Sequence, residues 1–109
     1  MIKYKTPFKL KPLIAGNNLA YQVALNTVGH VRACTLHNAT GASVEVSVYI
    51  LPENIAEVDS THQMVKKVLS SGESYLCPEL ANHNLQAGDK VFFVGEGVNA
   101  MLSVMEQNA

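Results

Sequence analysis

Histidine and cysteine are the residues of this chain best suited to chemistry, and their spacing argues against a metal site. The 109-residue chain has histidines and cysteines only at His30, Cys34, His37, His62, Cys77 and His83. It contains no HxH, HExxH or CxxC motif, the spacings that bring metal ligands together. His30 and His37 are seven residues apart on one expected strand, so we expect them on opposite faces. We therefore expect no metal site and no cofactor.

A cysteine nucleophile would need a base within hydrogen-bond distance. We expect His30 on the same strand face as Cys34, but four residues along a strand span about 13 Å. We therefore expect no catalytic residue and predict that the chain is not an enzyme. Cys34 and Cys77 both lie in expected strands, where a free cysteine behaves as a small buried hydrophobe. We expect reduced, buried thiols, and a disulfide between them is the alternative that spacing does not exclude.

The composition is that of one folded domain. Hydrophobic residues make up 48% and charged residues 16% of the chain, enough apolar material for a core within a length that suits a single domain. No apolar run approaches the roughly 18 residues that span a bilayer, and the N-terminus lacks the features of a signal peptide. We therefore expect a protein made in a cytoplasm, with no membrane partner.

Charge is unevenly distributed along the chain. Residues 1–11 contain four lysines and no acid, whereas the remainder contains four basic residues and nine acids. The first segment therefore carries +4 and the rest −5. Such asymmetry favours a segment that binds an acidic surface, with a solvated, mobile terminus as the alternative. Because the acidic remainder would repel a phosphate backbone, we do not expect nucleic acid as a partner.

Residues 1–18 are predicted to form an extended, lysine-rich N-terminal arm. Pro7 and Pro12 each remove a backbone donor and favour extended geometry in the preceding residue. Lysines alternate with apolar residues, a pattern compatible with an edge strand, and a turn over 16–18 follows. The candidate partner-binding residues of the arm are Lys3, Tyr4, Lys5, Phe8, Lys9, Leu10 and Lys11.

Residues 19–109 consist of short β-like runs separated by turn residues. The clearest run is 43–50, where Val44, Val46, Val48 and Ile50 alternate with other residues; this period of two predicts one face on a core. Further strands are expected over 19–25, 30–38, 64–69, 74–77, 90–94 and 99–106, with a long loop over 52–63, with or without a helical turn. Seven strands, or eight with the arm, predict an antiparallel β-sandwich of jelly-roll or immunoglobulin-like type.

Two stretches resemble a known class of proteins. They are ACTLHNATGASVEVSVYILP and VLSSGESYLCPELANHNLQAGDKVFFVGEGVNAMLSVMEQ. The turns at 71–74 and 85–91, each leading into a strand, resemble those of small β-sandwich structural proteins of tailed bacteriophages. The resemblance covers residues 19–107 and is one of turns and strands rather than of a chemical motif.

The resemblance implies a virion protein present in many copies and assembled in the host cytoplasm. It implies capsid cement or decoration first, with neck, tail or fibre components as alternatives. The partners would be the major capsid protein or other virion proteins and further copies of this chain. A ligand- or receptor-binding β-sandwich module is the competing interpretation from a different class.

Overall fold

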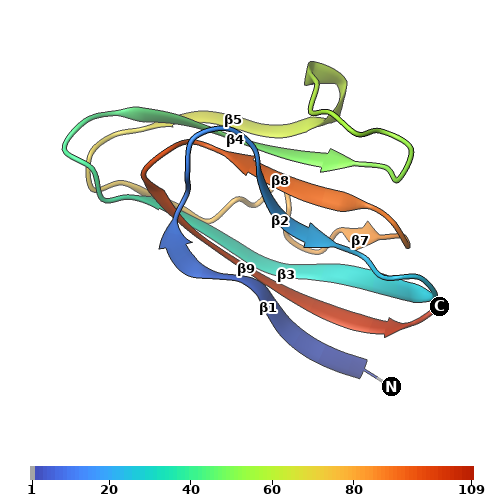
Figure 1. The fold of residues 1–109 in the computed structure, drawn as a ribbon. Helices are drawn as coiled ribbons and strands as arrows, with labels where there is room; N and C mark the ends of the chain where they lie inside the picture. Colours follow the sequence, from blue (N-terminus) through green and yellow to red (C-terminus); the bar gives the residue numbers. More distant parts are fainter. Residues whose placement is uncertain (1) are drawn as a thin grey trace.

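The computed structural model describes residues 2–109, and it confirms an all-β sandwich (Figure 1). The nine strands within these residues are β1 (Ile2–Pro12), β2 (Asn18–Gln22), β3 (Thr27–Asn38), β4 (Val44–Leu51), β5 (Gln63–Leu69), β6 (Ser74–Tyr75), β7 (Asn84–Leu85), β8 (Lys90–Val94) and β9 (Val98–Asn108). A single 3₁₀ turn, η1 (Ser60–His62), interrupts the long loop before β5. None of the described residues belongs to a helix with the length and apolarity needed to cross a membrane.

The strand pairing is that of a jelly roll. One sheet, sheet A, has the order β1-β9-β3-β6, with β7 also paired to β3; the other, sheet B, has the order β2-β8-β4-β5. The first strand pairs with the last, β2 with β8, β3 with β6 and β7, and β4 with β5, always antiparallel. This nested arrangement, in which a long hairpin folds into two facing sheets, decides between the two sandwich types that the sequence left open.

The core lies between the sheets and confirms the pattern over 43–50. Val46 and Val48 are fully buried in β4. The register shift after Val48 places its extra residue, Met64, in β5; at the end of β4, Ile50 is only partly buried and Leu51 is buried.

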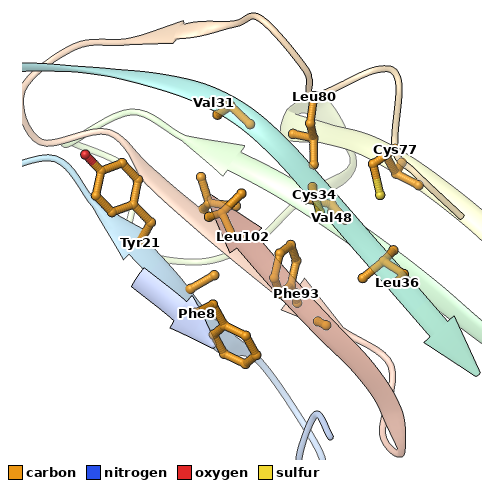
Figure 2. Close-up of a cluster of buried hydrophobic side chains, with 14 of the residues drawn as sticks. Phe8, Tyr21, Val31, Cys34, Leu36, Val48, Cys77, Leu80, Phe93 and Leu102 are labelled. Atoms are coloured by element: carbon orange, nitrogen blue, oxygen red, sulfur yellow. The ribbon is translucent and has the colours of Figure 1, made fainter. Parts of the chain in front are cut away.

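Aromatic residues join the two sheets at the centre of the core. Phe8 of β1 meets Phe93 of β8 edge to face, with ring centroids 5.4 Å apart (Figure 2). This is a favoured geometry for aromatic pairs. The first strand is therefore packed against the opposite sheet as well as paired within its own.

Two buried asparagines fix the turns that connect the sheets. The Asn18 amide donates to the carbonyls of Ile14 and Phe93 at 3.0 and 3.1 Å. The Asn38 amide donates to the carbonyls of Ala42 and Leu69, both at 2.8 Å. Each side chain thus bonds one carbonyl in its own turn and one in a strand of sheet B, so each turn is held to that sheet.

Candidate partner-binding surface

The segment expected as an arm is the edge strand of sheet A. β1 lies along β9 at one side of the molecule (Figure 1) and pairs with no other strand. Its register is continuous from Ile2 to Lys5 and is shifted on either side of Phe8. One side of its backbone is therefore open to a partner, and the regular part of that edge is four residues long.

The seven candidate residues of the arm divide into two groups. Phe8 is only 5% exposed and belongs to this chain's own core, so it is not available as an anchor for a partner. The physical reason is that Phe8 meets Phe93 across the sandwich, which a free arm would not do. The other six side chains, Lys3, Tyr4, Lys5, Lys9, Leu10 and Lys11, are exposed.

Large apolar side chains are exposed mainly near the N-terminus. Five of the nine such residues in the described chain lie within the first nineteen positions: Ile2, Tyr4, Leu10, Ile14 and Leu19. Tyr4 and Leu10 are 66% and 62% exposed. β1 thus presents apolar side chains among cationic ones, and exposed apolar patches rimmed by polar residues mark interaction surfaces.

A shallow hollow of about 470 Å³ adjoins β1 on the outer face of sheet A. The sheet register aligns Tyr4 of β1, Met105 of β9 and His30 of β3, and all three line the hollow together with Arg32 and Asn82. The Arg32 guanidinium lies 4.8 Å from the centre of the Tyr4 ring, a cation–π contact. Arg32 adds a fifth positive charge to the basic edge. Its place there could not be predicted from the sequence, because β3 and β1 are joined only through β9.

A buried ionic cluster closes the end of the sandwich nearest the start of β1. Glu106 of β9 is 7% exposed. It accepts a hydrogen bond from the Tyr21 hydroxyl of β2 and pairs with the Lys5 ammonium at 2.9 Å. Burial alone would raise the pKa of Glu106, but the Tyr21 hydrogen bond and the Lys5 charge outweigh it and hold the pKa below its usual value. Lys5 is therefore ion-paired within the chain, and the Lys3 charge also acts on Glu106. Among the described residues, Lys3, Lys9 and Lys11 are the lysines of β1 that form no ion pair.

The expectation that His30 and His37 face opposite sides is wrong. Val31 and Cys34 are both buried although they are three residues apart, because a register shift lies between Val31 and Ala33. The extra residue turns both histidines to the outer face of sheet A, where His30 meets Asn84 and His37 meets Ser74, each at 2.7 Å. His30 is thus not on the face of Cys34 either.

A second hollow of about 340 Å³ lies between the sheets, beside β5 and β7. Its apolar lining is Ile50, Met64 and Leu85; its polar lining includes His62, His83 and Asp89. The His62 Nδ1 and the Asp59 carboxylate are 2.7 Å apart, and this hydrogen bond lowers the pKa of Asp59. No group of three or more histidine, cysteine or acidic residues within 2–109 is arranged to hold a metal ion.

Comparison with family models, with curated proteins and with solved structures found no significant match to this chain.

Proposed function

We propose that this chain is a non-enzymatic structural protein of a tailed-bacteriophage virion, of the capsid cement or decoration type. It attaches through β1 and the adjoining hollow to an acidic surface on the capsid or on a neighbouring copy. The observation that carries the attachment is the exposure of Tyr4, Leu10 and three lysines that form no ion pair within the described residues, along an open sheet edge.

The chemistry of β1 favours a selective partner over indiscriminate strand addition. Two prolines and several lysines on an edge strand hinder pairing with an arbitrary second strand. An acidic partner, by contrast, would attract the same lysines, and this attraction would guide the two proteins into contact. Exposed Tyr4 and Leu10 would then supply the apolar contact, as interface anchors generally do.

The virion part of the proposal is supported by the turn-and-strand resemblance and by the topology. Jelly rolls occur in viral capsid proteins, in lectins and in cupins. Fold alone does not choose among these uses. The exposed basic edge favours assembly over the other two.

The first test is the solution mass of the full chain by light scattering over a range of concentrations. We expect concentration-dependent oligomers for the native sequence and a monomer for Tyr4→Ser/Leu10→Ser. The matched control is Leu25→Ser/Val68→Ser, which removes two side chains of similar exposure from elsewhere on the surface and should associate like the native protein. Deletion of β1 is unsuitable, because it also removes the buried Phe8 from the core.

The second test is the copy number of the chain in phage particles purified from cells that make it, measured by quantitative mass spectrometry. A fixed, high ratio to the major capsid protein, lowered by Tyr4→Ser/Leu10→Ser, is expected for a cement protein. A few copies located at the neck, tail or fibre by electron microscopy would favour those components instead. A monomer that is absent from particles would contradict the proposal.

The second hollow favours one competing function, a ligand-binding module. Its apolar walls and few polar groups are the usual composition of a small-molecule site. Binding of a neutral sugar or similar ligand there should be abolished by Leu85→Trp, which fills the hollow, and left intact by the β1 variants.

A further inference from the structure

The two cysteines lie together in the core, although 42 residues separate them in the sequence. Cys34 on β3 is 1% exposed and Cys77, in the loop after β6, is completely buried; both are free. Figure 2 shows Cys77 and Leu80 projecting from one loop toward β3, where Cys34 lies.

The register of β3 and β6 leads the chain that follows β6 toward Cys34. Leu36 pairs with Tyr75 in this antiparallel ladder, and two further residues along each chain lead to Cys34 and Cys77. Residues directly opposite in such a ladder have Cα atoms about 4.5–5.5 Å apart. A disulfide needs a Cα separation of about 4.4–6.8 Å; the paired residues Leu36 and Tyr75, each two positions from a cysteine, and the burial of both thiols in one core bring the pair within reach.

The loop that carries Cys77 lies between β6 and β7, and it leaves the edge of sheet A after β6. Two residue pairs join β3 to the segment that runs from β6 to β7: Leu36 with Tyr75 and Gly29 with Leu85. Along β3 the paired residues are seven positions apart, whereas along the β6–β7 segment they are ten positions apart. The three additional residues leave the ladder after β6 and return where Val31 exchanges hydrogen bonds with Asn82 and His83, at 2.8 and 2.9 Å. Within this loop, only the buried side chains of Cys77 and Leu80 anchor the chain to the core.

Cys77 also has an unusual backbone conformation for a residue other than glycine. Its φ is +45°, in the left-handed region that costs a side-chain-bearing residue free energy. The turn is closed by a hydrogen bond of 3.0 Å from the Leu80 amide to the Cys77 carbonyl. The fold thus keeps a strained turn at the point that brings this thiol beside β3.

We propose that Cys34 and Cys77 are a built-in site of intramolecular disulfide formation, which pins the 76–83 loop to β3 when the chain meets an oxidising environment. A low-molecular-weight disulfide such as oxidised glutathione is the oxidant. The thiolate of one cysteine attacks it and releases one reduced glutathione; the second cysteine then displaces the other. Two thiols lose two protons and two electrons, one protein S–S bond forms, and two molecules of reduced glutathione leave. The inference does not depend on the proposed function.

The thiols of Cys34 and Cys77 react slowly with an oxidant while the protein is folded. A hydrogen bond with the Cys77 thiol, and then burial, hold the pKa of Cys34 far above its usual range. The thiolate is the reacting form, so oxidation proceeds during folding or after local opening of the 76–83 loop. The two cysteines are therefore cross-linked once, and the folded core then shields their disulfide from solvent.

The test is refolding of the full chain from urea at pH 8, with oxidised and reduced glutathione or with dithiothreitol alone. With the glutathione pair we expect a monomer lighter by two hydrogen atoms, no thiol detectable after denaturation, and a tryptic peptide linking Cys34 to Cys77. A disulfide across this loop should raise the melting temperature by about 8 °C or more, and reduction should reverse the rise.

The controls are Cys34→Ala and Cys77→Ala, each of which keeps one thiol. They should show neither the two-hydrogen loss nor the oxidant-dependent rise in melting temperature. Native protein that retains two free thiols, or that carries glutathione on either cysteine as its stable product, would overturn the proposal. These measurements on the native sequence decide the question even if a variant fails to fold.

Discussion

Tyr21 and Glu106 join the two sheets of the sandwich through a single buried hydrogen bond. Tyr21 lies on β2 of sheet B and Glu106 on β9 of sheet A, and the phenol hydroxyl donates to the carboxylate. Burial, followed by the neighbouring Glu106, raises the pKa of Tyr21 above its usual range. A buried carboxylate is stable here because Tyr21 and Lys5 both contact it.

Replacing Tyr21 by phenylalanine should destabilise the fold by about 1–3 kcal/mol, because Glu106 loses a donor while remaining buried. The measurement is the free energy of unfolding in urea at neutral pH. Tyr49→Phe is the control, since the Tyr49 hydroxyl makes only a long contact of 3.4 Å with the Gln63 amide. Equal losses in the two variants would show that the Tyr21 hydroxyl has no special role.

The stability of the native protein should fall in acid partly through Glu106. Its pKa in the folded protein lies below the ordinary value of 4.5, so the unfolded chain binds the proton more readily. The stabilisation is therefore complete at neutral pH and is lost as pH falls below about 5 toward the folded pKa. Urea titrations between pH 7 and 3 should show a steeper decline for the native protein than for Glu106→Gln. Parallel curves would contradict this assignment.

Gly29 is needed because the Tyr21 ring fills the space where a side chain would be. A Cβ at Gly29 would lie 2.8 Å from the Tyr21 hydroxyl oxygen and 3.1 Å from Cε2. We expect Gly29→Ala to cost about 1–3 kcal/mol. Adding Tyr21→Phe should recover part of this loss, because the nearest contact disappears. Gly41→Ala, where a Cβ would meet nothing within 4 Å, should leave the melting temperature nearly unchanged.

Phe8→Ala should destabilise the protein by about 3–5 kcal/mol, as expected for a buried aromatic ring. Lys9→Ala, one position along the same strand and exposed, should change the free energy of unfolding by less than about 0.5 kcal/mol. Chemical denaturation measures both. A neutral Phe8→Ala would mean that residues 1–12 form a detached arm in solution.

Val46→Asp should prevent folding, because it would place an unpaired charge at a completely buried position. Glu45→Lys, on the exposed neighbouring position, should fold normally. Circular dichroism and the solubility of the expressed chain distinguish the two outcomes. A soluble Val46→Asp protein with a cooperative melt would reverse the assignment of faces in β4.

Regular local patterns were sufficient to predict much of this fold. The alternation over 43–50 predicted the buried face of β4, and all seven expected strands are present, with small shifts at their ends. β7, within the stretch expected as a loop, is only two residues long and has too little sequence for a period to appear.

What could not be predicted depends on single residues and distant partners. Lysines surround Phe8 in the sequence, and only the position of Phe93 on the opposite sheet explains why it is buried. One extra residue between Val31 and Ala33 reverses the faces of His30 and Arg32, and no turn residue marks it. The hollow beside Tyr4 arises from three strands whose alignment is set by the whole ladder.

The nested pairing also fixes an order of events during synthesis on the ribosome. The innermost hairpin, β4 with β5, is complete once residue 69 has emerged, whereas β9 lies between β1 and β3 and is made after every other strand of the domain. Until β9 arrives, β1 has no partner in its sheet, and Phe8 and its lysines remain exposed to other nascent chains. Because contacts between Ile2 and Gln107 join the two ends of the domain, closure is slow by comparison with local hairpins. The surface proposed to bind a partner is thus the last one to be finished.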